Sequence, residues 1–347
     1  MKPIFKSLLL ATLILLSNGV NAQKFHYIVD FGFNFDNLES SDPYEPTRSL
    51  FRVKLAPQVG VKLGENHMLM AGADILQTLG DSIFPTRADY TLYYRFKNDN
   101  FGAVAGSFPR SYSVAHYPRS FFREDYCFFD TNIEGLMLQY ANTKKTGYAE
   151  FFFDWYGMNE KLRIDEFLLA ASSEYTFYDK KLIVGANLLL NHFKNDYYLG
   201  DAFLLERTQY NLYVGTDLQS LAPKFEELRV SFGTLSSMEH KRMLDRDTPW
   251  VNSVGWQANI SVMIKGFGLS NDFYFGDPQF AYHSQYGSEF YPGLPFYQAK
   301  RYNRTDLFYK WHNKFLEVRA DIIFHVMGNN YGTQVSNQQM LTLSVHI

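Results

Sequence analysis

Residues 25–36 read FHYIVDFGFNFD, with a large apolar side chain on every odd position. Three of the even positions carry Asp30, Asn34 and Asp36. Side chains of an extended strand point alternately to two faces, so this stretch predicts a β-strand with one apolar and one mostly polar face. Two environments accept such a strand: the core of a soluble sandwich, or the boundary between lipid and the water-filled lumen of a membrane barrel.

The N-terminal segment helps to choose between these environments. Lys2 and Lys6 precede the apolar run 8–16, and the small-residue site Val20-Asn21-Ala22 follows it. This pattern is typical of a secretory signal peptide, and we expect residues 1–22 to be one. The remaining chain, residues 23–347, has no run of eighteen apolar residues that would cross a bilayer as a helix. If it enters a membrane, it does so as strands.

The composition agrees with strands that have one polar, solvated face and one apolar face. The chain has 32 Phe and 25 Tyr, yet its mean hydropathy is −0.25. A formal net charge of −3 argues against a general nucleic-acid binder. A single cysteine, Cys127, excludes an intramolecular disulfide framework.

The alternation recurs along the whole chain, which predicts about sixteen strands, although fourteen or eighteen remain open. The expected strands cover residues 25–36, 48–63, 67–78, 87–97, 101–107, 133–140, 148–156, 166–177, 182–193, 205–218, 228–235, 253–264, 267–276, 304–312, 315–325 and 338–347. Pro57 lacks the N–H that a ladder requires, so it predicts a bulge or a shorter strand.

The connections between these strands alternate in length. The short ones are residues 64–66, 98–100, 142–147, 178–181, 219–227, 265–266 and 313–314. The longer ones are residues 37–47, 79–86, 108–132, 157–165, 194–204, 236–252, 277–303 and 326–337. Outer-membrane barrels have short periplasmic turns and longer external loops, whereas a soluble sandwich has no reason to alternate in this way. Strand 166–177 also has aromatic residues near both ends, as two aromatic girdles require.

On these features the mature chain resembles, in architecture only, the sixteen-stranded general porins of Gram-negative outer membranes. Its Tyr- and Phe-rich loops suggest a Bacteroidetes-type relative. The resemblance implies an all-β, up-and-down transmembrane barrel in the outer membrane, and a homotrimer. Ala71, Ala73, Ala103 and Ala105 would give the trimer a flat contact face. The final residue departs from the pattern, because Ile347 is not aromatic.

A barrel of about sixteen strands leaves an aqueous channel, so we expect a porin for passive diffusion of small hydrophilic solutes. Basic and acidic side chains on opposite walls would set a transverse field that tunes selectivity, unless they merely pair and hydrate the wall. The residues expected to line the pore are Arg52, Lys54, Lys62, Arg87, Arg95, Glu150, Asp154, Glu166, Glu174, Glu317, Arg319 and Asp321.

Two long connections are candidates for a role in selection. By the resemblance to general porins, the loop from Phe108 to Asp130 would fold into the barrel and form a constriction. Its charged candidates are Arg110, Arg119, Arg123, Glu124 and Asp125. The stretch 277–303 is rich in rings that can stack on the apolar faces of sugars. These rings are Tyr282, Tyr286, Phe290, Tyr291, Phe296, Tyr297 and Tyr302.

The sequence shows none of the common catalytic or metal-binding motifs, so we expect no enzyme, no cofactor and no metal site. Ser113 with His116, and Ser284 with His283, are the nearest nucleophile and base pairs, but both lie in expected loops. The expected partners are outer-membrane lipid and small hydrophilic solutes. The alternatives are a saccharide-selective channel, or a barrel plugged by its loops that acts as an adhesin or an acyl-chain enzyme.

Overall fold

The computed structural model describes residues 23–41, 45–144, 146–159, 164–178, 181–195, 202–243, 248–329 and 332–347. The expected signal peptide, residues 1–22, lies outside this part of the chain. The described strands form one antiparallel sheet. They are β1 (Gln23–Glu39), β2 (Arg48–Leu63), β3 (His67–Thr78), β4 (Arg87–Lys97), β5 (Phe101–Pro109), β6 (Asn132–Ala141), β7 (Gly147–Asn159), β8 (Ile164–Phe177), β9 (Leu182–Asn195), β10 (Phe203–Asp217), β11 (Glu227–Thr234), β12 (Ser236–Met243), β13 (Val251–Ser253), β14 (Gly255–Ile264), β15 (Phe267–Gly276), β16 (Arg301–His312), β17 (Leu316–Asn329) and β18 (Gly332–His346).

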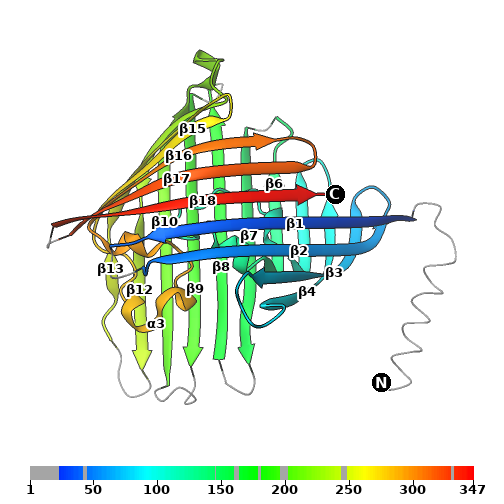
Figure 1. Ribbon diagram of the computed structural model, residues 1–347, viewed down its shortest axis with the longest axis horizontal. Helices are drawn as coiled ribbons and strands as arrows, with labels where there is room; N and C mark the ends of the chain where they lie inside the picture. Colours follow the sequence, from blue (N-terminus) through cyan, green and yellow to red (C-terminus); the bar gives the residue numbers. More distant parts are fainter. Residues whose placement is uncertain are drawn as a thin grey trace.

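The sheet closes into a barrel because the first and last strands pair. Phe31 of β1 lies opposite Val345 of β18, and the two strands run side by side in Figure 1. β10 pairs with β11 along one part of its length and with β12 along the other, so β11 and β12 act as a single barrel strand. β13 and β14 pair with these two halves and form the next one. The barrel therefore has sixteen strands, which confirms the expected count and the all-β class.

Several strands extend further than the alternation predicted, whereas the short turns lie where they were expected. The predicted connection 326–337 is wrong, because β17 continues to Asn329 and β18 begins at Gly332. The predicted connection 236–252 is also wrong, since β12 and β13 occupy much of it. Beyond the bilayer both faces of a strand meet water, so pairing continues there without an apolar face to reveal it.

Pro57 neither bulges nor shortens its strand. It lies opposite Val29 of β1, and the register between β2 and β3 is the same at Leu55 with Ile75 and at Gln58 with Gly72. The bulge predicted from the sequence is therefore wrong. Only the pairs of residues 56 and 57 with β3 are missing from an otherwise continuous ladder, as the absent N–H of proline requires.

The outer face of the barrel is apolar. Leu55, Tyr90, Leu188 and Leu212 are each at least two fifths exposed, whereas the residues that alternate with them point inward. This arrangement is the one that lipid demands of a barrel exterior. Among the described residues, none of the helices is long and apolar enough to cross a membrane.

Two connections fold into the barrel rather than away from it. The arginine loop, residues 110–131, contains the one-turn helices η1 (Arg110–Tyr112) and α2 (Tyr126–Phe129). The aromatic loop, residues 277–300, contains α3 (His283–Phe290) and η3 (Pro295–Gln298). Figure 1 shows α3 beside β9 and β12, within the outline of the barrel. A fifth short helix, η2 (Gln219–Leu221), lies in a turn.

The loops and the wall share an apolar core that closes much of the lumen. Phe121 of the arginine loop, Tyr291 and Tyr297 of the aromatic loop, and Phe152 of β7 are all almost completely buried in one cluster. Tyr302 was expected in the loop, but it lies in β16 and is buried as well. Most of the rings that were expected to face solutes therefore pack against one another.

Candidate functional site

The arginine loop is fastened at its base by Arg110. The Arg110 guanidinium donates to Asp154 of β7 at 2.6 Å and to Asp130 at the other end of the loop at 3.2 Å. Ser113 donates to Glu150 of the same strand at 2.5 Å. The loop thus lies against the β7 wall before it crosses the lumen.

Arg119 carries the loop to the opposite wall. Its guanidinium is ion-paired with Glu124 of the same loop, with Asp272 of β15 and, at 2.9 Å, with Asp306 of β16. Asp272 and Asp306 are almost fully buried. Burial alone would lower the pKa of Arg119, but the three carboxylates outweigh it and raise that pKa well above its usual value. Arg119 is therefore a permanent cation that bridges the lumen.

Arg304 of β16 completes this cluster. It donates to Glu124 at 2.9 Å and to Asp306 at 2.6 Å. Burial would raise the pKa of Glu124, yet Arg304 and Arg119 together hold it well below the usual range of a glutamate. We call Arg119, Glu124, Asp272, Arg304 and Asp306 the lumen cluster. Three carboxylates share two guanidiniums in it, so removal of either arginine leaves negative charge unpaired.

A second group of charges holds the far end of the arginine loop against β1 and β2. Asp125 of the loop pairs with Arg123 at 2.8 Å and with Arg48 of β2 at 3.5 Å, and Arg48 also pairs with Asp36 of β1 at 3.1 Å. Arg52 is completely buried beside Asp36, and its guanidinium lies 4.0 Å from the ring centre of Phe129. All five charged residues predicted in this loop thus form ion pairs inside the barrel.

The two inner loops are joined to each other. The Arg123 amide donates to the carbonyl of Pro292, and the Leu294 amide donates to the carbonyl of Arg119, both at 2.9 Å. Gly293 lies between these bonds, and a Cβ on it would fall 2.0 Å from the Ser120 carbonyl oxygen. Glycine at this position therefore allows the close approach. One loop was expected inside the barrel, and the structure places two there, in contact with each other.

The aromatic loop is also fastened to the wall. The Tyr291 hydroxyl donates to Glu239 of β12 at 2.5 Å, and the Ala281 amide donates to the same carboxylate at 3.2 Å. Arg207 of β10 is fully buried next to Glu239, with 3.7 Å between the Arg207 Nε and a carboxylate oxygen. Burial and the neighbouring carboxylate raise the pKa of Tyr291, so its hydroxyl remains a donor.

Polar cavities flank the lumen cluster on two sides, and Arg119 and Glu124 line both of them. The larger has a volume of about 420 Å³, with amide side chains from β9, β10 and β14 on one side and Tyr117 and Phe122 of the arginine loop on the other. The smaller has a volume of about 300 Å³ and is lined in part by Glu317, Arg319 and Asp321. The ion pair of Arg119 with Glu124 thus lies between two hydrated spaces.

Most side chains predicted to line the pore are paired inside the barrel. The pairs are Arg52 with Asp36, Lys54 with Asp74, Arg87 with Asp89, Asp154 with Arg110, Glu174 with Arg229, Glu317 with Lys310, and Arg319 with Asp321. Arg95 lies 4.0 Å from the ring centre of Tyr112, and Glu150 accepts from the Ser113 hydroxyl. Lys62 and Glu166 are half-buried on β2 and β8. Local pairing weakens a field between opposite walls, and the roles of these residues in permeation remain a prediction.

Sequence reasoning missed the residues on the far side of the lumen. Arg304 and Asp306 occupy alternate inward positions of β16, and Asp272 has the same orientation on β15. The predicted strands 267–276 and 304–312 already hold these three residues at inward positions, so the alternation rule that selected Arg52 could have found them. Arg207 and Glu239 also lie at inward positions, and the latter falls in a segment predicted as a loop.

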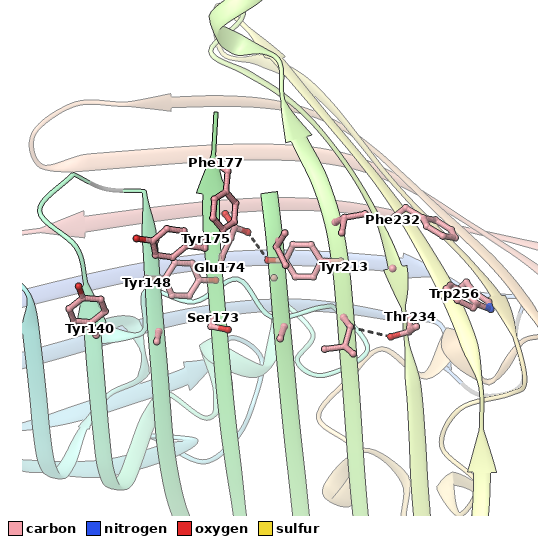
Figure 2. A pocket seen from close by; sticks show the side chains of 18 residues that line it. Tyr140, Tyr148, Ser173, Glu174, Tyr175, Phe177, Tyr213, Phe232, Thr234 and Trp256 are labelled. Carbon is pink, nitrogen blue, oxygen red and sulfur yellow. Dashed lines mark hydrogen bonds between the residues drawn. The ribbon is translucent and has the colours of Figure 1, made fainter. Parts of the chain in front are cut away.

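The outer face of the barrel carries an apolar groove of about 830 Å³ across β6 to β11 and β14. Figure 2 shows Tyr175 and Phe177 on one side of it and Phe232 and Trp256 on the other. Small side chains such as Ala149 and Ala186 form its floor. No histidine or cysteine lies among its lining residues. Its chemistry suits hydrocarbon rather than a polar solute.

Nothing in the described part of the chain groups histidine, cysteine, aspartate and glutamate side chains so that they would hold a metal ion. The candidate catalytic pair Ser113 and His116 lies in the arginine loop, where Ser113 is bonded to Glu150. His283 packs against the rings of Phe280 and Tyr291 in the aromatic loop.

Comparisons with solved structures agree with the fold. OprB of Pseudomonas putida is 9% identical, with a TM-score of 0.54 and coverage of 97% of this chain and 96% of that one. OccK8 (OprE) of Pseudomonas aeruginosa is 10% identical, with a TM-score of 0.50 and coverage of 93% and 98%. A loop-deletion mutant of OmpT, an outer membrane protein of Vibrio cholerae, is 10% identical, with a TM-score of 0.50 and coverage of 94% of this chain and 100% of that one. This likeness confirms the porin-like barrel fold.

Curated proteins provide no match to this chain. A family model does match, and it corrects the expectation that the protein is not an enzyme. That model is described as Lipid A 3'-O-deacylase-type and matches residues 21–346. The absence of short catalytic motifs was therefore a poor guide, because a site assembled from distant strands leaves no local motif. Since the match covers nearly all of the sequence, the chain belongs to the Lipid A 3'-O-deacylase-type family.

Proposed function

We propose that the protein is a water-filled channel through which small hydrophilic solutes diffuse, with a path constricted by the arginine loop and the aromatic loop. The observation that carries this proposal is the position of the lumen cluster between two polar cavities. A sixteen-stranded barrel is wide enough for an aqueous channel, and these loops narrow it. Charge at the narrowest place then has the largest influence on which solutes pass.

We assign selectivity to the lumen cluster rather than to the strand walls. Most wall charges have a partner nearby, whereas the cluster holds three carboxylates against two guanidiniums in the described structure. A net negative charge favours cations over anions in a narrow passage. Conductance across a planar bilayer tests both parts of the proposal. Ohmic steps with cation preference are expected, and an absence of current from correctly folded barrels would refute the channel.

The wall charges offer a separate test. Replacement of Arg52, Lys54 and Arg87 by Gln removes three basic side chains from β2 and β4 and leaves the lumen cluster untouched. If selectivity resides in the lumen cluster, the reversal potential in a salt gradient changes little, and the transverse field between walls is discarded. A large shift toward cations would instead show that the wall charges contribute to selectivity.

Hydrolysis of an acyl ester of a lipid is the second candidate function. The match to the deacylase-type family favours it, and the apolar groove on the outer face has room for an acyl chain. Incubation of the purified barrel with lipid A, followed by mass spectrometry, tests it. Loss of one acyl chain would establish the activity, and unchanged lipid A under conditions that keep the barrel folded would count against it.

We also propose that the barrel forms a homotrimer through β3 to β5. Tyr90, Leu92 and Tyr94 of β4 are exposed and stand between the alanines of β3 and β5, so the surface is a ridge between two shallow rows. This shape differs from the flat patch that was expected, but it suits interlocking with another copy. Native mass spectrometry of Leu92→Trp against the wild-type protein tests it, because a bulky side chain on the ridge should reduce the trimer.

A further inference from the structure

Four inward-facing polar side chains lie next to one another on the wall beneath the aromatic loop. Arg207 and Gln209 belong to β10, Asn191 to β9 and Ser237 to β12. The register places Arg207 opposite Asn191 and Gln209 opposite Ser237. Residues opposite each other on one face of a sheet have neighbouring side chains. We call these four residues the polar strip.

The polar strip is buried, and its hydrogen-bonding groups are unused. Arg207, Gln209 and Asn191 have no exposed surface, and Ser237 is 2% exposed. All three guanidinium nitrogens, both polar atoms of each amide and the Ser237 hydroxyl have no hydrogen-bond partner. Buried polar atoms are almost always paired, and an unpaired one destabilises the arrangement that buries it. The closed position of the aromatic loop is therefore under a free-energy penalty that a polar occupant would relieve.

The aromatic loop covers the strip with rings and is held by a neighbouring residue. The guanidinium of Arg207 lies 4.5 Å from the ring centre of Phe280 and 5.0 Å from that of Tyr291. Beside the strip, the loop is hydrogen-bonded to Glu239, which accepts from the Tyr291 hydroxyl and the Ala281 amide. The closed loop thus gives the strip ring contacts with Arg207 but no hydrogen-bond partner for its amides and hydroxyl.

The chemistry of the strip selects a class of solute. Its amides and hydroxyl both donate and accept, and the positive charge of Arg207 is balanced by Glu239 at 3.7 Å. A neutral solute with many hydroxyl groups satisfies both kinds of group, and its apolar ring faces would stack on Phe280 and Tyr291. An anion or a cation would upset the local charge balance.

We propose that the polar strip is a saccharide-binding site, reached from the lumen when residues 280–291 of the aromatic loop move away from the wall. The inference rests on the proposed channel, because the channel supplies the route for the solute. Binding places sugar hydroxyls on the strip, where the structure leaves donors and acceptors unused, and rings of the displaced loop cover the sugar from above.

Calorimetric titration of the full barrel in detergent with maltotriose tests the site. The double variant Asn191→Leu/Gln209→Leu removes four polar atoms at similar volume and should weaken binding at least about tenfold, the factor that one net hydrogen bond provides. Ser237→Ala is a milder change that should weaken binding in the same direction. Thr91→Val is the matched control: it removes an unpartnered buried hydroxyl on β4, at a distance in the barrel, and should leave the affinity unchanged.

Tyr291→Phe tests the movement of the loop. It removes a bond that holds the loop closed, so a larger fraction of molecules is open and the apparent affinity for maltotriose should rise. Equal affinity for maltotriose in the wild type, the double variant and Ser237→Ala would overturn the site, as would an absence of binding to the wild type. Conductance measured on the same preparations distinguishes failure of the binding site from failure of the channel. A barrel that conducts, but whose binding of maltotriose does not depend on the polar strip, refutes only the site. A barrel that binds maltotriose without conducting refutes only the channel.

Discussion

The lumen cluster predicts that Arg119→Gln opens the constriction. Glutamine keeps a polar side chain of moderate length, but it cannot pair with Glu124, Asp272 and Asp306 together. Two of these carboxylates, on β15 and β16, are at least nine-tenths buried. The arginine loop would then keep only the pair of Glu124 with Arg304 on the far wall, while Arg110 keeps its base fixed to β7.

The magnitude follows from the partners that remain. Removal of one member of a buried ion pair costs roughly 3–5 kcal/mol. Asp306 retains Arg304 at 2.6 Å, and Asp272 retains the Asn259 amide at 2.6 Å, so we expect the lower end, about 3 kcal/mol. Since 1.4 kcal/mol is a factor of ten, the ratio of docked to undocked loop should fall roughly a hundredfold.

Single-channel recording measures this change. The Arg119→Gln barrel should show larger and noisier conductance, with a stronger preference for cations because one positive charge has left the passage. Arg119→Lys separates charge from geometry: the cation remains, but a point charge cannot bridge three carboxylates, so noise should rise with little change in selectivity. Conductance and selectivity equal to the wild type in Arg119→Gln would show that this residue does not control the passage.

Three further predictions follow from other contacts. Gly293→Ala should separate the two loops and increase current noise, because its Cβ would clash with the Ser120 carbonyl. Gly328→Ala is the control, since a Cβ there makes only ordinary contacts and should not change the noise. Equal noise in the current traces of the two variants would contradict this prediction. The pKa of Glu124 is held below the usual range of a glutamate, so the stability that its ion pairs provide is lost only at a pH below that range. Hydrogen exchange of residues 110–131 should therefore stay slow at about pH 4.3, the usual glutamate pKa. Fast exchange of these residues at that pH would count against the ion pairs. Leu188→Arg on the outer face should destabilise the barrel in bilayers by about 2–4 kcal/mol, whereas Leu221→Arg in a turn should have little effect; equal effects would mean that Leu188 does not face lipid.

The sequence predicts the strands of the barrel wall well because every second residue faces lipid and must be apolar. Each outward position of β9, for example, needs an apolar side chain, so the strand is readable from local alternation alone. The same physics explains where the prediction stops. At the ends of β17 and β18 both faces are wet, and a paired strand there looks like a loop.

The partners of the inner loops could not be read locally. Arg119 meets residues 153 and 187 positions away along the chain, and only the closed barrel brings those positions to one level of the lumen. The sequence identified the charged residues of the arginine loop but gave no sign of which wall would receive them. The enzyme family was missed for a related reason, since no short motif carried it.

The buried charges and the aromatic rings are two parts of one arrangement. Rings of both loops keep water from the side chains that they cover, and exclusion of water makes an unpaired charge there unfavourable. The lumen cluster meets that requirement by placing each guanidinium between carboxylates from a loop and a wall. The polar strip meets it only in part, because Arg207 is ion-paired with Glu239 but the guanidinium and the amides are buried without hydrogen-bond partners. The closed loops therefore stabilise the lumen cluster but leave the polar strip without hydrogen-bond partners. A solute that displaces the aromatic loop would gain the most hydrogen bonds at the polar strip.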